Sequence, residues 1–249
     1  MNRPAAFLLI IALSAGSASQ AIAQSLVADM SESSISITSN FTGKDILLFG
    51  AVDVPSDIVV IVQGPREKMV VRRKGRVSGI WMNRQSVTFP GVPAYYAVAS
   101  NRPLDEIASQ TVREQYRMGS TFLDFAVDAS TPHLAGEELF EFREAIFRNK
   151  RRDKLYFETD NSVQFRERLF RTSIVFPTRA PEGDYTVTTY LLRDGLVIAE
   201  QLTPLEIRKA GFERKVFDLA NQRPALYGII AVLIALTSGW LAAAAFRRT

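Results

Sequence analysis

Apolar and polar residues alternate along much of the N-terminal half of this chain, which is the pattern of β-strands. At residues 34–38 the alternation places Ile35 and Ile37 on one face of a strand. Residues 45–52 and 58–63 are instead nearly continuous apolar runs, so we expect two strands that are either buried on both faces or placed at the core of a sandwich. Glycine and proline residues separate these runs and indicate turns between strands.

Further short strands are expected at residues 69–77, 80–82, 87–89 and 95–99. A weak repeat is present, because residues 86–90 and residues 173–177 have similar sequences. The repeat indicates either two sandwich halves or two similar strand-turn corners. We favour the second interpretation, since the chain between residues 103 and 154 has too few strand signals for two complete sandwiches.

The period of the apolar residues changes to that of a helix between residues 103 and 152. One helix is expected to begin near Pro103, and its apolar face consists of Leu104, Ile107, Ala108, Val112 and Tyr116. A second helix is expected at residues 136–150, with acidic residues at its start and basic residues at its end, as the helix dipole favours. Residues 122–127 between the two helices are strand-like.

The clearest strand signals come after the helices. A strand is expected at residues 169–176, and a turn through Gly183 and Tyr185 leads into a long strand. Asp194-Gly195 favours a type I′ hairpin turn, and a returning strand follows at residues 196–207. A Gly-x-Tyr turn before a long penultimate strand resembles the last two strands of immunoglobulin-like sandwiches.

Together these segments predict a mainly β protein with an immunoglobulin-like β-sandwich ectodomain. The sandwich is expected to occupy residues 24–207 and to contain a helical insertion at about residues 103–152. The chain has no cysteine, which excludes disulfides and thiolate metal sites. A domain of this length can bury enough apolar surface to be stable without them.

A long uncharged segment lies close to the C-terminus. Residues 225–246 contain 22 residues without a charge, between Arg223-Pro224 and Arg247-Arg248. At about 1.5 Å per residue, such a helix crosses the roughly 30 Å hydrocarbon layer of a bilayer. We therefore predict a transmembrane helix at residues 224–246. Residues 208–223 form either an amphipathic juxtamembrane segment or a continuation of that helix into water.

The N-terminus has the features of a secretory signal peptide at residues 1–23. Arg3 precedes a short apolar run, and Ala21-Ile22-Ala23 matches the small-x-small cleavage pattern. We expect cleavage before Gln24, with an uncleaved anchor as the alternative. Export of the N-terminal side, and the preference of arginines for the cytoplasm, predict a single-pass protein with a cytoplasmic tail at residues 247–249.

Three arginines at the two ends of the chain supply most of the net charge of +4. Without Arg3, Arg247 and Arg248, the 30 Lys and Arg residues become 27 against 26 Asp and Glu residues, a net charge of +1. This near balance gives no indication of nucleic-acid binding. The basic composition therefore reflects the ends of the chain and not a nucleic-acid partner.

Two groups of residues are candidate contact sites. A basic run either contacts anionic lipid headgroups or a partner, or is simply solvated; it consists of Arg72, Arg73, Lys74 and Arg76. A stripe of small residues in the predicted span allows another helix to approach closely, from a partner or from a second copy of this chain; it consists of Ala231, Ala235 and Gly239. Alanine-rich spans also produce such stripes by chance.

Catalytic signals are weak. The only histidine is His133, and no Gly-x-Ser-x-Gly motif accompanies it, so we interpret it as a loop or helix-start residue. No calcium-loop spacing or phosphate-binding glycine loop occurs, and we predict no metal, no cofactor and no enzymatic activity. The alternative is a carboxylate-based hydrolase of envelope material, with candidate residues Glu137, Glu138, Asp153 and Glu158.

Several motifs are similar to those of a known family. They are the signal peptide, the blocks at residues 45–51, 70–74, 79–81, 89–93 and 190–195, and the segment at residues 208–214 that leads into the span. On these the chain resembles the alphaproteobacterial putative transmembrane protein family, over nearly the whole mature chain. The resemblance implies the inner membrane of a Gram-negative cell, with the domain in the periplasm. It implies no catalytic or binding residues.

We therefore expect a periplasmic β-sandwich, anchored by one helix, that acts as a binding or accessory module for another membrane or envelope protein. A permease or exporter is the partner class to test first. The alternatives are the hydrolase described above and a structural or ligand-sensing ectodomain.

Overall fold

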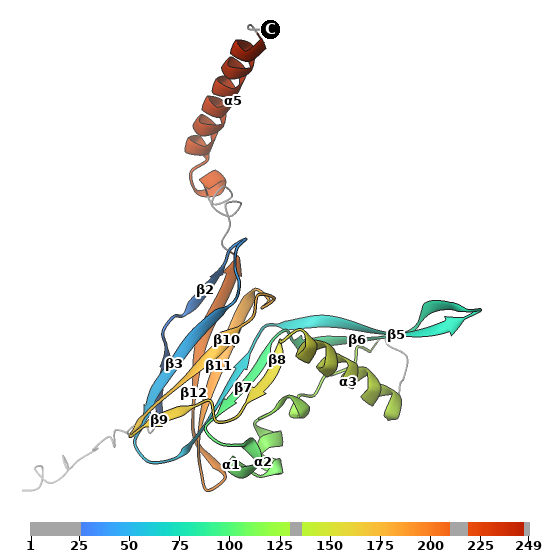
Figure 1. The fold of residues 1–249 in the computed structure, drawn as a ribbon, viewed down its shortest axis with the longest axis vertical. Helices are drawn as coiled ribbons and strands as arrows, with labels where there is room; N and C mark the ends of the chain where they lie inside the picture. Colours follow the sequence, from blue (N-terminus) through green and yellow to red (C-terminus); the bar gives the residue numbers. More distant parts are fainter. Residues whose placement is uncertain (1–25, 130–135, 210–218, 247–249) are drawn as a thin grey trace, which may run out of the picture.

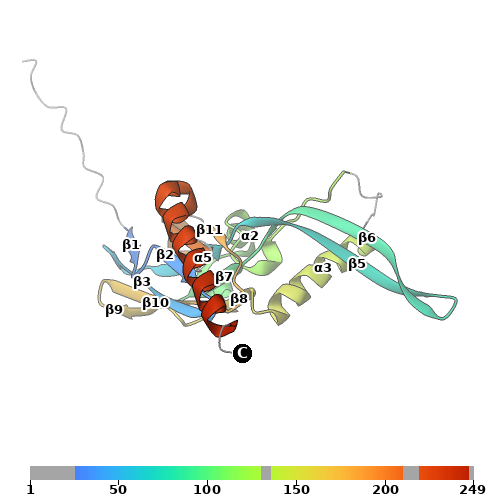
Figure 2. The ribbon, with the colours of Figure 1, turned by 90° about the horizontal axis from the view of Figure 1, so that it is seen from above.

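The fold is a sandwich of two β-sheets, from which a long hairpin and one helix project (Figure 1, Figure 2). The structure is a computed structural model that describes residues 26–129, 136–209 and 219–246. The predicted signal peptide, His133 and the predicted tail lie outside these residues. So does most of the predicted juxtamembrane segment, in which residues 208–209 continue the last strand and residues 219–222 are helical.

The first sheet has four antiparallel strands in the order β1-β3-β10-β9. Their bounds are Leu26–Met30 for β1, Lys44–Val52 for β3, Leu169–Phe176 for β10 and Gln164–Arg166 for β9. The strand predicted at residues 169–176 is confirmed, and its residues alternate strictly between exposed and buried. One face of this sheet therefore lies in the core, and the other is open.

The second sheet has six strands in the order β2-β12-β11-β4-β7-β8. Their bounds are Ser34–Ile37 for β2, Leu196–Lys209 for β12, Gly183–Arg193 for β11, Asp57–Gln63 for β4, Tyr96–Ser100 for β7 and Tyr156–Thr159 for β8. β2 is parallel to β12 and β8 is parallel to β7, whereas the other pairs are antiparallel. Asp194 and Gly195 both have positive φ, as the predicted type I′ turn requires.

The order of the strands agrees with the predicted fold class. If β1, β3, β4, β9, β10, β11 and β12 are lettered A to G, the two sheets contain the A-B-E-D and G-F-C orders of immunoglobulin sandwiches. The hydroxyl of Tyr185 donates to the carbonyl of Pro181 at 2.7 Å, the contact that defines a tyrosine corner. A mainly β sandwich with one C-terminal apolar helix is thus confirmed.

Aromatic side chains fill the space between the sheets. Tyr95 stacks on Phe176 with a centroid distance of 5.3 Å, and the ring of Tyr185 lies 5.7 Å from Tyr95. The Tyr95 hydroxyl donates to the carbonyl of Val175 at 2.8 Å, so its polar atom is satisfied inside the core. Burial raises the pKa of Tyr95 well above its usual range, and the hydroxyl therefore stays a donor.

On one side of the sandwich, the side chain of Gln201 makes the two hydrogen bonds to β1 that a neighbouring strand would otherwise make. The amide of Gln201 on β12 donates to the carbonyl of Ala28 on β1 at 2.7 Å. Its oxygen accepts from the Ala28 amide at 2.9 Å. Gln201 thus satisfies both backbone groups of an edge residue and joins the two sheets.

The helical insertion covers the outer face of the second sheet over β4, whereas outward residues of β12 such as Leu202 stay exposed. Its elements are α1 (Leu104–Ile107), α2 (Gln110–Gln115), the short 3₁₀ helix η2 (Ser120–Phe122) and α3 (Glu137–Arg152). The ring of Tyr116 contacts that of Tyr190 on β11, with centroids 5.4 Å apart. Because this face is covered, residues 58–62 of β4 are buried on both sides, the first of the two alternatives predicted for this run.

Two predictions for the insertion are wrong in detail. The helix expected after Pro103 is split, because Ala108 is extended and Ser109 begins α2 with a side-chain cap to the amide of Val112. The stretch at residues 122–127 is not a strand, since η2 is followed there by irregular backbone. No neighbouring strand edge is paired with these residues.

The long hairpin consists of β5 (Arg66–Val77) and β6 (Ile80–Pro93), and we call it the arm. The sequence predicted shorter separate strands here. Ser78 and Gly79 have φ of 51° and 85°, so they form a two-residue type I′ turn. Residues 86–90 lie in the arm, whereas residues 173–176 lie in β10 of the sandwich. The sequence repeat is therefore two similar segments in different sheets.

Candidate functional site

The four-stranded sheet presents large apolar side chains on its outer face, and we call this surface the open apolar face. Its members are Val27, Leu47, Phe49, Leu169 and Val175. Their exposed fractions run from 43% for Leu47 to 59% for Leu169. Of the two alternatives for residues 45–52, β3 follows the second: its inward residues lie in the sandwich core, and its outer face is uncovered among the described residues.

The strand register places these side chains next to one another. Ala51 of β3 lies between Val27 of β1 and Leu169 of β10, so the three form one row across the sheet. Phe49 lies in the next row, between Asp29 and Arg171. Neighbouring strands are about 4.8 Å apart, so side chains in a row are in contact range. The apolar members thus lie in adjacent rows of the sheet, with the polar residues Asp29 and Arg171 between them.

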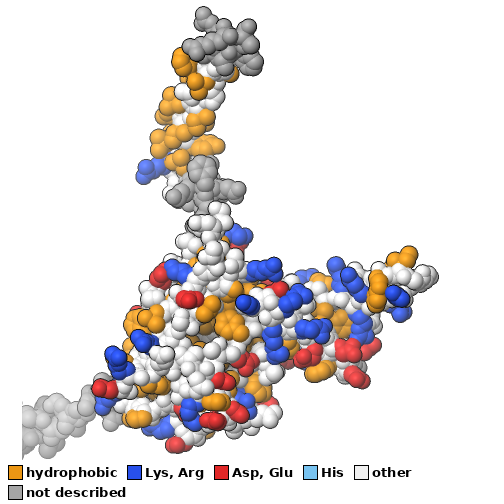
Figure 3. Space-filling model, viewed as in Figure 1, with side chains coloured by type: hydrophobic (Ala, Val, Ile, Leu, Met, Phe, Trp, Pro, Cys, Tyr) orange, Lys and Arg blue, Asp and Glu red, His pale blue; other side chains and the backbone are white. Residues whose placement is uncertain are grey.

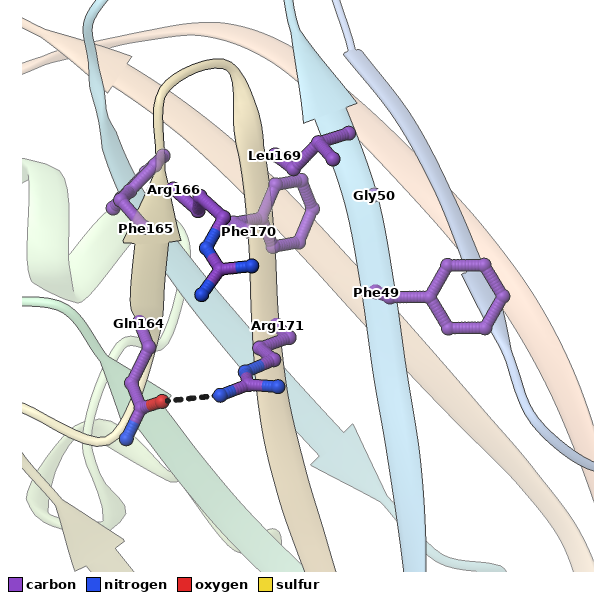
Figure 4. A pocket seen from close by; sticks show the side chains of 8 residues that line it. All are labelled: Phe49, Gly50, Gln164, Phe165, Arg166, Leu169, Phe170 and Arg171. Atoms are coloured by element: carbon purple, nitrogen blue, oxygen red, sulfur yellow. Dashed lines mark hydrogen bonds between the residues drawn. The ribbon is translucent and has the colours of Figure 1, made fainter.

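A shallow hollow of about 440 Å³ borders this face, between β3 and the hairpin formed by β9 and β10 (Figure 4). The polar side chains at its edge are Gln164, Arg166 and Arg171, and Arg171 donates to Gln164 at 3.3 Å. Figure 4 shows Phe49 projecting away from β9 and β10. The residues that line the hollow include no carboxylate, so it lacks the acid pair of a glycosidase.

The predicted basic residues lie on β5 of the arm, and the structure separates them. Arg72, Lys74 and Arg76 are exposed on one face of the hairpin. Arg73 points to the other face, forms an ion pair with Glu141 of α3, and lies 5.2 Å from the centroid of the Phe142 ring. Arg73 therefore holds the arm against α3 and is not available to a partner, whereas the other three are.

The predicted helix-packing residues lie on α5 (Pro224–Phe246). This helix contains a candidate span of 20 residues, Pro224–Ala243, with a mean hydropathy of 2.0. None of that window is buried by the rest of the described chain. Apart from the neighbouring residues and backbone of α5 itself, no described atom lies within 4 Å of a Cβ built on Gly239. The stripe of Ala231, Ala235 and Gly239 is thus accessible, although its partner helix stays a prediction.

The candidate carboxylates of the alternative hydrolase are dispersed. Glu137 and Glu138 lie at the start of α3, and Asp153 follows its end. A helix of that length separates them by roughly 24 Å at about 1.5 Å per residue, beyond the separation of paired catalytic carboxyls. Glu158 accepts from the amide and hydroxyl of Ser120 at 2.7 Å. Among the described residues, no group of three or more possible metal ligands occurs.

One carboxylate, that of Asp57, has a shifted pKa, and its partners explain the shift. Asp57 accepts two hydrogen bonds from Arg102 and one from Asn101. Partial burial raises the pKa of Asp57, but the hydrogen bonds from Arg102 and Asn101 outweigh it, so the pKa is lowered overall. The pair joins the start of β4 to the start of the insertion.

Sequence reasoning missed the open apolar face and the tip of the arm. A continuous apolar run on β3 hides which residues point outward. The signal was in the partner strand, where exposed Arg171 and Ser173 alternate with buried residues and mark the outward face. The exposed tip residue Trp81 was assigned to a short strand, since the Ser78-Gly79 turn beside it was not recognised.

The described residues define a class of protein: a membrane-anchored β-sandwich with one candidate span. The family described as "Putative transmembrane protein (Alph_Pro_TM)" matches residues 25–248, and the chain belongs to this family. The resemblance inferred from the sequence motifs is thereby confirmed. No curated protein and no solved structure matches the chain. The immunoglobulin-like classification therefore stays a prediction that rests on strand order.

Proposed function

We propose that this chain is a single-pass inner-membrane protein whose periplasmic sandwich binds another membrane or envelope protein through the open apolar face. The observation that carries the proposal is the exposure of five large apolar side chains in adjacent rows of one sheet. Contiguous exposed apolar surface of this kind is typical of protein contact sites. The role is that of a non-catalytic binding or accessory module.

The free energy available from burying this face is sufficient for a specific contact between two proteins that are anchored in the same membrane. Complete burial of a Val, Leu or Phe side chain is worth about 1.5–3 kcal/mol. The five side chains are roughly half exposed, so covering them gives on the order of 5 kcal/mol before the cost of association. A partner in the same membrane is at a high effective concentration, which lowers the affinity that the contact must supply.

The anchor supports the same function. The family match begins at residue 25, one residue after the predicted mature N-terminus at Gln24, and includes α5. The small-residue stripe of α5 offers a second contact inside the bilayer. A permease or exporter has both a periplasmic surface and transmembrane helices, so it remains the partner class that we would test first.

The docking face is tested by charge insertion with matched controls. Leu47→Lys and Leu169→Lys on the open apolar face should each abolish recovery of a crosslinked partner with the full-length protein. Leu196→Lys and Leu202→Lys are the controls, because these leucines are 63% and 60% exposed on β12 of the other sheet. If both pairs reduce recovery equally, or neither does, the open apolar face is not the binding site.

The contribution of the anchor is tested separately. Replacing Ala235 and Gly239 together by leucine should preserve insertion but weaken any complex that depends on helix packing. The orientation is tested with single introduced cysteines, because the chain has none. Glu200→Cys should react with an impermeant maleimide in intact spheroplasts, and Thr249→Cys should react only after permeabilisation. The reverse labelling pattern would exclude a periplasmic domain.

A further inference from the structure

The arm ends in exposed apolar side chains that no described element covers. Ile80, Trp81 and Met82 are 67%, 63% and 52% exposed. The arm projects beyond α3 in both views (Figure 1, Figure 2). An isolated two-stranded ribbon is only marginally stable in water, so an exposed tip of this composition needs a reason other than folding.

The arm is also strongly basic. Residues 68–88 contain six Lys and Arg residues and no Asp or Glu. In the described part of the chain, only Arg73 of these six forms an ion pair. The other five are Lys68, Arg72, Lys74, Arg76 and Arg84, all exposed. The guanidinium of Arg76 lies 5.3 Å from the centroid of Trp81, so charge and aromatic surface are joined directly at the tip.

The charge is distributed unevenly around the arm. Figure 3 shows Lys and Arg side chains along the arm to its tip, whereas Asp and Glu side chains gather below the arm, where Figure 1 places α3. The alternation of β5 places Arg72, Lys74 and Arg76 on the face of the ribbon opposite that of Arg73, whose side chain pairs with Glu141 of α3. One face of the arm is therefore positive and free of acids, and it ends in Ile80, Trp81 and Met82.

We propose that this arm lies on the anionic surface of the bilayer that α5 spans, with Trp81 in the headgroup region and its basic face on lipid phosphates. Tryptophan favours the membrane interface, where its apolar ring and its N–H are both accommodated. Lys and Arg beside it are attracted by anionic headgroups. An exposed apolar tip next to basic residues fits the surface of an anionic bilayer. An acidic protein would bind the basic residues alone and would leave the apolar tip unexplained.

The tether makes this contact geometrically possible. Lys209 at the end of β12 and Pro224 at the start of α5 are separated by 14 residues. These residues span at most about 50 Å when fully extended. The arm itself is about 40 Å long, since β5 has 12 residues and a strand rises about 3.4 Å per residue. The tether and the arm are therefore of similar length, which allows the tip to lie on the membrane that holds the chain.

The test uses the full-length chain in vesicles and the fluorescence of one tryptophan. Trp240→Phe leaves Trp81 as the sole tryptophan. In phosphatidylcholine vesicles that contain phosphatidylglycerol, brominated acyl chains should quench Trp81, and its emission should shift to the blue. In phosphatidylcholine alone, or at high salt, the quenching should be lost.

Charge reversal supplies the matched comparison. Arg72→Glu, Lys74→Glu and Arg76→Glu together should abolish the quenching, since each lost basic residue lowers the docked-to-free ratio about fivefold, equivalent to about 1 kcal/mol. The control reverses three exposed arginines elsewhere on the ectodomain, Arg166, Arg168 and Arg193, and should retain the quenching. Circular dichroism establishes that both triple variants are folded.

A second pair of variants keeps the charges and removes the apolar tip. Ile80→Ser with Met82→Ser should reduce the quenching without changing the charge, whereas Leu47→Lys on the open apolar face should leave it unchanged. Equal quenching in both lipid mixtures, or quenching that survives the charge reversal, would overturn the proposal. Absence of quenching in every mixture would also overturn it, and crosslinks from the tip to a protein would then assign the arm to a protein partner.

Discussion

The ion pair at the base of the arm offers a direct test of what holds the arm to the sandwich. The ammonium of Lys150 on α3 lies 2.5 Å from a carboxylate oxygen of Glu67 on β5 and 3.1 Å from the carbonyl of Ala94. The side chain of Lys150 is only 5% exposed, whereas that of Glu67 is 40% exposed. Removing the Glu67 carboxylate therefore leaves the buried Lys150 ammonium without a charged partner, whereas removing Lys150 leaves a carboxylate that water can reach.

This difference in burial between Lys150 and Glu67 sets the stability losses that we expect for variants at the two positions. Breaking a buried ion pair by removing one partner typically costs about 3–5 kcal/mol, and the partial exposure of Glu67 reduces this, so we expect Glu67→Gln to cost about 2–3 kcal/mol. Lys150→Met leaves a carboxylate that water can reach and one unpaired carbonyl, at a cost of about 1–2 kcal/mol. The double variant should resemble Lys150→Met, because the stranded charge is then absent.

The assay is thermal unfolding of the full-length chain in detergent micelles, followed by the circular dichroism of the β-sheet band. For a domain of this size, 1 kcal/mol shifts the melting temperature by about 2–4 °C. Glu67→Gln should therefore lower it by about 5–10 °C, roughly twice the effect of Lys150→Met.

The control is an ion pair of equal length on the surface. Lys44 and Glu32 are also 2.5 Å apart, but their side chains are 35% and 46% exposed. Glu32→Gln should change the stability by less than about 0.5 kcal/mol. Glu67→Gln could lower the melting temperature no more than Glu32→Gln does, or the losses of stability from Glu67→Gln and Lys150→Met could add in the double variant. Either result would refute the claim that burial of Lys150 makes this ion pair stabilising.

Two further predictions concern the sandwich. Gly50→Ala should lower stability by about 1–3 kcal/mol in the same thermal assay, because a Cβ there would lie 2.3 Å from the carbonyl oxygen of Val27 and 2.5 Å from the ring of Phe170; an unchanged melting temperature would contradict this. Asp57→Asn should destabilise the protein at pH 7 by about 1 kcal/mol, the value of a partly exposed ion pair with Arg102. The pKa of Asp57 is lowered by folding, so its stabilisation is present above the unfolded value near pH 4 and disappears as the pH falls through the folded value. The difference between Asp57→Asn and wild type should therefore narrow below about pH 4, and a difference independent of pH would contradict this.

Most of the sandwich could be predicted because its strands carry local signals. The alternation at residues 169–176 and the Asp194-Gly195 turn fix two strands and one hairpin without knowledge of distant neighbours. The apolar run of α5 fixes the candidate span in the same way. These features depend on side-chain period and turn chemistry, which are properties of short segments.

The open apolar face could not be predicted, because it depends on which elements cover each sheet. Residues of β3 and β4 are similarly apolar, yet the insertion covers β4 and leaves the outer face of β3 exposed. The arm was missed for a related reason. Its strands pair only with each other, and the basic and apolar residues at the tip indicate neither a core nor a partner by themselves.

Photo-crosslinking from Phe49 in living cells tests the central claim most directly. A photoreactive phenylalanine analogue at Phe49 should give one dominant adduct with another membrane or envelope protein, and Leu169→Lys in the same chain should remove it. The same analogue at Glu200, exposed on the other sheet, should give no such adduct. Absence of an adduct from Phe49, or the same adduct from Glu200, would contradict docking through the open apolar face.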